Sequence, residues 1–220
     1  MELTMHKEYF SEKGWKILNS LKHLFTKYHF KLAGGTALAL HLGHRISMDL
    51  DFFTNRDFKA DSIISEIRKT RYTFRLISEG ERYLILDING IKVSLFTYEY
   101  PFLEKTRLNR GIQVAGILDI ASMKVIAISQ RGTKRDFIDL FFIFQIFPFH
   151  RVAEHMVKRF GKERINPVHI GKSLVYFSDA ESNPDPDYIM GKDVKWDNVK
   201  KFFRRHVKQY VFDLDMALKD

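Results

Sequence analysis

The chain has 220 residues and a formal net charge of +9; 45% of its residues are hydrophobic and 29% are charged. This composition is that of an ordinary soluble protein and excludes a disordered, collagen-like or coiled-coil chain. Its length suffices for one domain or two small ones, each with a buried core. The absence of cysteine excludes disulfides, thiolate zinc sites and cysteine nucleophiles.

Neither a membrane span nor a secretory signal is expected. The phenylalanine-rich run at 137–149 is interrupted by Asp139 and Gln145 and is shorter than the roughly 20 apolar residues of a membrane helix, so we interpret it as a buried helix. Residues 1–14 lack an apolar signal core, which favours a cytoplasmic location and no membrane partner. The positive charge is compatible with a polyanionic partner, although many basic proteins bind no nucleic acid.

The first hundred residues predict an α/β unit. The expected elements are an amphipathic helix from Trp15 to Tyr28, a short strand over 30–35 that ends in a glycine turn, a helix of about two turns over 36–43, a strand over 46–53, a helix capped by Asp57 or Asp61, and a hairpin turning at Asn89-Gly90.

After Pro101 the pattern becomes mostly helical. We expect a helix over 118–129 capped by Asp119, a helix over 134–144, and further helices near 150–160, 167–177 and 194–217, with one long loop at 178–193. The predicted fold class is therefore α/β (α+β). A core with a short mixed sheet covers residues 1–105, and a helical region packed on that core covers residues 106–220.

The most informative motif begins at Gly34-Gly35-Thr36. A strand that enters these residues and continues into a helix presents backbone amides at a helix N-terminus, where an anion such as a phosphate binds favourably. Glycine also allows a ligand to approach the backbone closely. Taken alone, a Gly-Gly pair is most often a plain turn.

A pair of aspartates follows on the predicted strand at 46–53. Side chains alternate along a strand, so Ser47, Asp49 and Asp51 share one face, while Met48, Leu50 and Phe52 point into the core. Two carboxylates about 7 Å apart on one face repel each other unless a cation lies between them, and hard oxygen ligands suit Mg²⁺. The simpler alternative is a solvated strand face.

In combination the two features resemble a known family. The pattern G-G-T, ten residues, S-x-D-x-D, followed by Phe-Phe, is similar to that of the AbiEii toxins of type IV toxin–antitoxin systems, a group of polymerase-β-like nucleotidyltransferases. Residues 118–140 also resemble the downstream part of this family, with a lysine in a helix, a basic turn and an R-D-x-x-D helix start. A looser similarity at 173–181 extends the resemblance from about residue 25 to the end of the chain.

Charged residues of the second match have alternative interpretations. Lys124 lies among apolar helix neighbours, where an unpaired ammonium is costly, and a phosphate or a carboxylate would remove that cost. Asp136 is either a catalytic carboxylate that orients or deprotonates the attacking hydroxyl or an N-terminal helix charge, and in the second case Asp139 would pair with Arg135. Arg131, Lys134 and Arg135 are interpreted as a solvated basic turn that nucleic acid could contact.

The resemblance implies a Mg²⁺-dependent nucleotidyltransferase that transfers a nucleoside monophosphate from a nucleoside triphosphate to an acceptor hydroxyl. The implied acceptor is RNA, such as the 3′ end of tRNA, and a cognate antitoxin is an implied partner. The implied site residues are Asp49 and Asp51 as metal ligands, Gly34, Gly35 and Thr36 at the phosphates, Arg45 and Ser47 at the outer phosphate oxygens, Lys124 at the triphosphate or acceptor, and Asp136 at the attacking hydroxyl.

One departure from the superfamily concerns the third carboxylate, which comes from a neighbouring strand. The corresponding strand offers Ser94 instead, and Asp87 could supply the acid, although an ion pair with Lys92 across the hairpin is the simpler role. His41 and His44 are expected to be solvated or capping residues and not metal ligands. The alternative function is a catalytically inactive member of this fold that binds RNA or an antitoxin.

Overall fold

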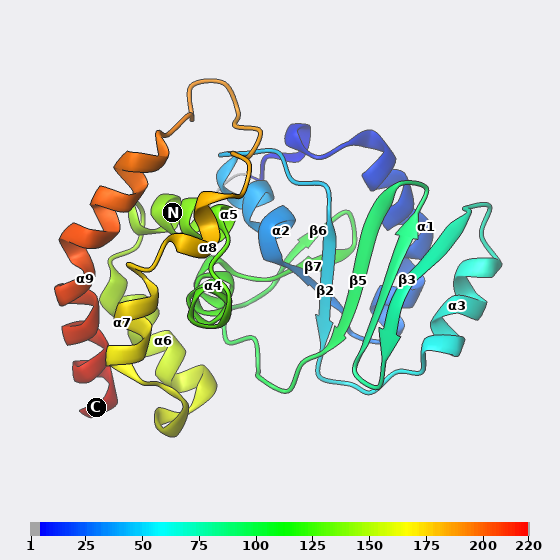
Figure 1. The fold of residues 1–220 in the computed structure, drawn as a ribbon. Coiled ribbons are helices and arrows are strands. Elements are labelled where there is room, and N and C mark those ends of the chain that lie inside the picture. The colour runs from blue at the N-terminus through cyan, green and yellow to red at the C-terminus, as the bar shows by residue number, and fades with distance from the viewer. Residues whose placement is uncertain (1–4, 220) are drawn as a thin grey trace. The chain divides into compact units, whose positions relative to one another are not determined.

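The computed structural model describes residues 5–219. Residues 1–4, which belong to the segment considered for a signal sequence, and Asp220 lie outside the described part. The chain divides into two compact units, one up to Gly116 and one from Ile117 (Figure 1). Among the helices described, none has both the length and the apolar composition needed to cross a membrane.

The first unit is built on a seven-stranded mixed sheet with strand order β3-β4-β5-β2-β1-β7-β6. Strand β2 runs parallel to β5, and β1 runs parallel to β7. The other neighbouring strands are antiparallel. Its elements are η1 (Lys7–Tyr9), α1 (Glu12–Lys27), β1 (Lys31–Ala33), α2 (Gly34–Leu42), β2 (Leu50–Thr54), α3 (Ala60–Arg68), β3 (Phe74–Gly80), β4 (Tyr83–Ile88), β5 (Ile91–Thr97), β6 (Arg107–Asn109) and β7 (Ile112–Val114).

The core of this unit lies between α1 and the sheet. In Figure 1, α1 lies behind the strands. The rings of Phe25 on α1 and Phe52 on β2 stack with centroids 4.0 Å apart. Strand alternation explains why Leu50 and Phe52 are fully buried on this face while Asp51 and Phe53 lie on the other.

The predicted hairpin at Asn89-Gly90 is confirmed. Both residues have positive φ angles, 52° for Asn89 and 80° for Gly90, which a two-residue hairpin turn of this type requires. The hairpin sets Ile88 opposite Ile91 and Asp87 opposite Lys92. It therefore fixes which residue of β4 faces each residue of β5.

Three local predictions for the first unit are wrong. Strand β2 begins only at Leu50, so Met48 lies before the strand and is 53% exposed, not buried. Helix α3 begins at Ala60, and its N-cap is Lys59, without a side-chain cap from either aspartate proposed. The sheet also includes β6 and β7, which places residues 106–116 in the first unit and the boundary of the units at Gly116, later than the boundary at 105 inferred from the sequence.

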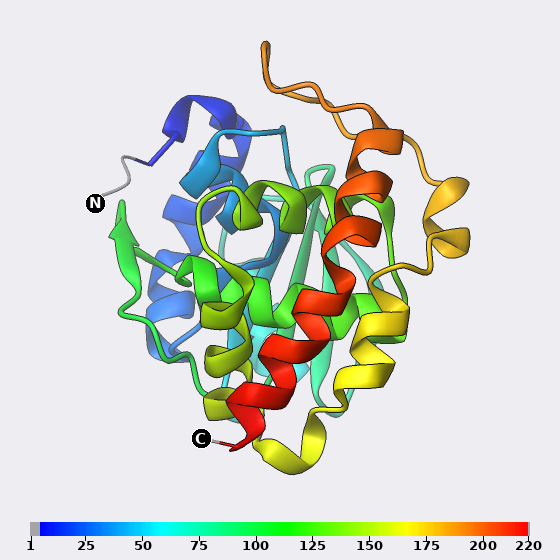
Figure 2. The same cartoon turned by 90° about the vertical axis from the view of Figure 1, so that its left-hand side faces the viewer.

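The second unit is helical, as predicted. In Figure 2 its long C-terminal helix α9 runs along α6 and α7, and both helices contact it. Phe137 and Phe203 are fully buried and meet edge to face at 5.4 Å. The elements are α4 (Ile117–Gln130), α5 (Lys134–Phe144), α6 (Phe149–Phe160), η2 (Lys162–Arg164), α7 (Pro167–Ser173), α8 (Ser178–Glu181) and α9 (Trp196–Lys219).

Two features of this unit differ from expectation. Asp119 does not cap a helix, because α4 already begins at Ile117 and the aspartate lies within its first turn, fully buried. The expected loop at 178–193 contains the short helix α8.

Candidate active site

The glycine pair lies where β1 passes into α2. Gly34 has a φ of +65°, a left-handed conformation that favours glycine, and a Cβ atom there would lie 2.8 Å from Oδ2 of Asp51. A Cβ atom on Gly35 would collide with the guanidinium of Arg45 and lie 3.1 Å from Oγ of Ser47. Both positions therefore require the absence of a side chain, and the helix start is brought directly against three of the predicted site residues.

Thr36 ties the segment before β2 to the start of α2. Its side chain is almost fully buried, and its Oγ1 lies 3.0 Å from Oγ of Ser47. The same hydroxyl donates a hydrogen bond to the backbone carbonyl of Asp49. Thr36 consequently positions the backbone that carries Asp49. This role is additional to the phosphate contact inferred from the sequence.

Asp51 and Asp49 have different surroundings. Asp51 is on β2, half-buried, in register with Ala33 of β1. Asp49 precedes the strand and is exposed. The strand alternation that was expected to place Asp49 and Asp51 on one face therefore holds only from Leu50 onward. The carboxylate of Asp51 lies beside the glycine pair.

Ser94 occupies the strand position beside Asp51. The two residues are register partners on the parallel strands β2 and β5, and Ser94 is 1% exposed. Asp87 is opposite Lys92, two register positions away from the pair that Ser94 makes with Ile85. Its Oδ1 accepts a hydrogen bond of 2.7 Å from the amide of Gly90, and the expected ion pair with Lys92 does not form within the part of the chain that is described. Neither residue thus places a third carboxylate next to Asp51.

The donor set suits Mg²⁺ bound jointly by protein and nucleotide. Residues 5–219 contain no cluster of three or more histidine, cysteine, aspartate or glutamate side chains able to hold a metal. Asp49 and Asp51 offer only carboxylate oxygens, and Mg²⁺ is typically held by one or two carboxylates plus water and substrate phosphates. The residues present therefore fit a metal that arrives with a triphosphate.

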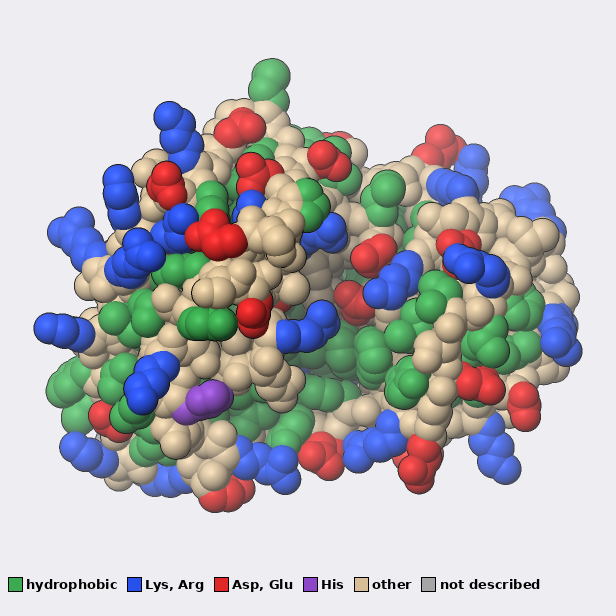
Figure 3. All heavy atoms as spheres, in the orientation of Figure 1, with side chains coloured by type: hydrophobic (Ala, Val, Ile, Leu, Met, Phe, Trp, Pro, Cys, Tyr) green, Lys and Arg blue, Asp and Glu red, His purple; other side chains and the backbone are tan. Residues whose placement is uncertain are grey.

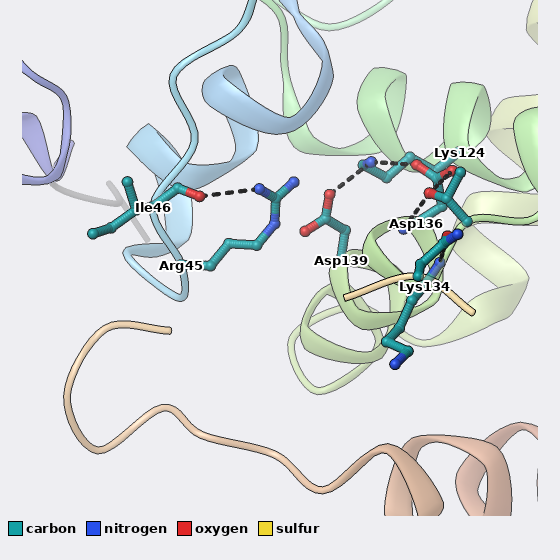
Figure 4. Close-up of polar contacts among 8 residues, drawn as sticks. Arg45, Ile46, Lys124, Lys134, Asp136 and Asp139 are labelled. Atoms are coloured by element: carbon teal, nitrogen blue, oxygen red, sulfur yellow. Dashed lines mark hydrogen bonds and ion pairs between the residues drawn. The ribbon is translucent and has the colours of Figure 1, made fainter. Parts of the chain in front are cut away.

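Arg45 is a buried cation, with 3% exposure. Its Nη1 donates a 3.2 Å hydrogen bond to the carbonyl of Ile46 (Figure 4). The other terminal nitrogen is the atom that a Cβ on Gly35 would strike. A guanidinium at the start of α2 adds positive charge to the amides of that helix N-terminus.

In the second unit, two carboxylates converge on Lys124. The Nζ atom lies 2.9 Å from Oδ1 of Asp136 and 2.6 Å from Oδ2 of Asp139. Figure 4 marks both contacts with dashed lines. Thr133 donates a 2.7 Å hydrogen bond to the second oxygen of Asp136 and caps α5. The anionic partner that Lys124 requires is thus supplied by carboxylates of α5, and Asp139 pairs with Lys124 instead of Arg135.

The basic turn is only partly solvated. Arg131 and Arg135 are exposed, but Lys134 is buried and forms a 3.2 Å ion pair with Asp185. Its ammonium also lies 5.6 Å from the ring centroid of Trp196. The prediction that Lys134 is a solvated residue is therefore wrong, and its partners come from the loop before α9 and from the first residue of that helix.

His41 and His44 are both buried, contrary to the expected solvated or capping roles. Nε2 of His41 lies 2.8 Å from the carbonyl oxygen of Ala115. Burial lowers the pKa of His41, and that hydrogen bond only partly opposes the shift. His41 consequently belongs to the core of the first unit.

Sequence reasoning missed a buried polar network in the second unit. Asp119 lies 3.4 Å from Nε2 of His155 and 3.6 Å from Nη1 of Arg159, and the same arginine nitrogen donates a 2.6 Å hydrogen bond to the Asp119 carbonyl. Nδ1 of His155 lies 3.0 Å from Oγ of Ser122. Burial lowers the pKa of His155, against the attraction of Asp119. The four-residue spacing of His155 and Arg159 on the apolar side of a helix was the available signal.

The chain matches the family described as "Nucleotidyl transferase AbiEii toxin, Type IV TA system" over residues 16–77 and 71–217. A protein of Aquifex aeolicus is 42% identical over 187 residues, which cover 83% of this chain and 88% of the relative.

Two solved structures are similar in fold. The nucleotidyltransferase toxin MenT4 of Mycobacterium tuberculosis has a TM-score of 0.59 at 16% identity, covering 94% of this chain and 91% of its own. The protein JHP933 of Helicobacter pylori has a TM-score of 0.56 at 16% identity, and the match covers 94% of this chain and 95% of the JHP933 chain. At these identities the likeness shows the fold, which is the one predicted.

Proposed function

The chain belongs to the AbiEii family of nucleotidyltransferase toxins of type IV toxin–antitoxin systems, and from this premise we propose that it transfers a nucleoside monophosphate from a nucleoside triphosphate to an RNA hydroxyl. The observation that carries the proposal is the closeness of Gly34 and Asp51. A phosphate-binding helix start and a carboxylate are held together there by the register of β1 and β2. This is the arrangement that a metal-bound triphosphate requires.

The first unit would bind the triphosphate. Backbone amides at Gly34 and Gly35 and the hydroxyl of Thr36 would hold phosphate oxygens, while Arg45 and Ser47 would contact the outer ones. Asp49 and Asp51 would hold Mg²⁺, which when bound neutralises charge on the phosphates and the leaving group. Glycine is required at both helix positions because any side chain would occupy the space beside Asp51 or Arg45.

The second unit would supply Lys124 and Asp136. The carboxylate of Asp136 is 18% exposed and is oriented by Thr133 and Lys124, so it is suited to accept the proton of an attacking hydroxyl. Lys124 would hold Asp136 in this orientation and attract phosphate of the triphosphate or of the acceptor. Asp139, which is fully buried, would keep Lys124 charged and in place.

The acceptor we propose is the 3′ end of an RNA such as tRNA, within the cytoplasm, where tRNA and nucleoside triphosphates occur. The net charge of +9 supports a polyanionic acceptor over an acidic protein. On helix α9, exposed cations further support RNA binding: Lys201, Arg204, Arg205 and Lys208. A cognate antitoxin is the proposed protein partner.

One observation favours a second candidate, a protein that retains this fold without catalysis and regulates by binding RNA or an antitoxin. Ser94 stands beside Asp51 where the superfamily places a third carboxylate. The test is whether millimolar Mg²⁺ with a nucleoside triphosphate raises the melting temperature. Stabilisation supports the enzyme, and no stabilisation supports the inactive binding protein.

The experiment for the enzyme is incubation of the protein with total RNA, Mg²⁺ and each labelled nucleoside triphosphate. We expect a labelled RNA band whose intensity falls steeply as salt rises, because phosphate contacts dominate RNA affinity. Label on a protein band with none on RNA would show that the acceptor is wrong.

A further inference from the structure

We propose that one row of side chains on the sheet of the first unit stacks the bases at the single-stranded end of the acceptor RNA. The row consists of Lys31, Phe53, Phe96 and Tyr83, which are successive register partners on β1, β2, β5 and β4. We call these four residues the aromatic row. The inference rests on the proposed function and adds to it a binding surface for the acceptor.

The aromatic row lies on the same sheet face as Asp51. Phe53 follows Asp51 by two positions on β2, and Phe96 follows Ser94 by two positions on β5, so strand alternation places all four on one face. Two residues along a strand correspond to about 6.6 Å. The aromatic row is therefore the next row of side chains after the one that contains the proposed metal ligand.

The rings of this row have accessible surface. Phe53 and Phe96 stack with centroids 5.2 Å apart and an interplanar angle of 23°, and Tyr98 meets Phe53 edge to face at 5.5 Å. All four members are half-buried, whereas Phe52, on the other face of the same strand, is fully buried. In Figure 3, hydrophobic side chains gather on the face of the sheet turned toward the viewer, over β2, β5 and β3.

The position of the row favours the acceptor over the triphosphate. From Lys31 beside Phe53, β1 runs to Ala33 beside Asp51 and then into the glycine pair, so the proposed phosphate site and the aromatic row lie on opposite sides of Asp51. In phosphoryl transfer the attacking and leaving oxygens are roughly in line. A hydroxyl opposite the pyrophosphate therefore enters from the side of the aromatic row.

The dimensions and chemistry of the row suit more than one base. Four strands spaced about 4.8 Å apart give a row of about 14 Å, which exceeds a single nucleobase. Aromatic rings hold single-stranded nucleic acid without a strict sequence preference, because every base has a π face. At one end, Lys31 lies 5.0 Å from the ring centroid of Phe102 and supplies a positive charge for the RNA backbone.

The test compares Phe96→Leu and Phe53→Leu with the matched control Phe58→Leu. Phe58 is also half-buried, but it meets Phe30, which contacts Phe52 on the other face of the sheet. We expect each row variant to weaken binding of a short, fluorescently labelled adenosine oligoribonucleotide about 5- to 150-fold, which corresponds to loss of one stacked base. The KM for RNA should rise similarly, while the KM for the nucleoside triphosphate and all values for Phe58→Leu stay at wild type.

An abasic oligonucleotide separates stacking from charge. It keeps the phosphates but has no bases, so wild type and Phe96→Leu should bind it equally. Three results would overturn the inference. Both row variants could bind the adenosine oligonucleotide with wild-type affinity, or they could lose as much affinity for the abasic strand as for the adenosine oligonucleotide. The third is a rise in the KM for the triphosphate alone. If wild type labels no RNA but the variants lose base-dependent binding, the aromatic row stands and the proposed transfer to RNA fails.

Discussion

Nζ of Lys124 lies 2.6 Å from Oδ2 of Asp139, whose side chain is completely buried. An ammonium and a carboxylate in such a place neutralise each other, and removal of the ammonium takes a nearby countercharge away from a fully buried carboxylate, which is costly. Asp136 joins the same ammonium from a more exposed position. One lysine therefore pairs with a buried carboxylate, Asp139, and with the more exposed carboxylate that we propose acts in the transfer, Asp136.

The first prediction is that Lys124→Ala destabilises the protein much more than Asp136→Asn. Loss of the ammonium should lower the free energy of unfolding by about 3–5 kcal/mol. Asp136→Asn leaves the pair of Lys124 and Asp139 intact and should cost about 1 kcal/mol or less. Denaturant unfolding measures both values, and Asp136→Asn should still abolish transfer. Equal stability of the two variants would show that burial of the Asp139 carboxylate does not depend on the ammonium of Lys124.

The second prediction concerns the proposed metal ligands. Asp51→Asn and Asp49→Asn should each remove Mg²⁺-dependent binding of a nucleoside triphosphate, because the neutral amide is a poor ligand for a hard cation. Isothermal titration with and without Mg²⁺ measures this binding. The exposed Asp57→Asn is the matched control and should bind as wild type. Retained Mg²⁺-dependent binding of the nucleoside triphosphate in Asp51→Asn would contradict the assignment of Asp51 as a metal ligand.

The third prediction separates backbone strain from steric blockage at Gly34. Gly34→Ala places a side chain at a positive φ and against Asp51, whereas Gly191→Ala, at a φ of +79°, has no atom within 4 Å of its Cβ. Both variants should lose about 1 kcal/mol of stability from the backbone conformation alone. Only Gly34→Ala should also lose nucleotide affinity, measured by titration. Normal affinity in that variant would place the phosphates elsewhere.

Local patterns in the sequence predicted the elements well because they depend on neighbours along the chain. The apolar spacing of α1 and the Asn89-Gly90 turn needed no tertiary information. Likewise, the spacing from Gly34 to Asp51 sufficed to suggest a phosphate site beside a carboxylate. Met48 was misplaced because the pattern alternates before Leu50, where the structure has no strand.

Features that depend on distant segments could not be predicted. Lys134 is buried because Asp185 and Trp196 pack around it, some 50 or more positions along the chain. Asp119 can be recognised as a core residue only once its partners on α6 are known. Recognition of the aromatic row required the pairing of four strands, of which only β4 and β5 were joined by a recognisable turn.

The last prediction is a loss of stability on mild acidification, caused by the buried residues His41 and His155. Burial lowers the pKa of both below the ordinary value of 6.5. Between that value and the lower folded-state pKa, the unfolded chain binds more protons than the folded one, so stability falls as the pH falls below 6.5. One such histidine contributes at most about 1.4 kcal/mol per pH unit.

Thermal unfolding at about pH 7.5 and about pH 5.5 brackets the titration of histidine and stays above that of most carboxylates. We expect a lower melting temperature at the acidic value and a smaller difference in His155→Gln, which cannot acquire the charge beside Arg159. The exposed His150→Gln should retain the wild-type difference. If His155→Gln keeps the full difference as well, protonation at this position does not destabilise the second unit, and the network around Asp119 accommodates a charged imidazole.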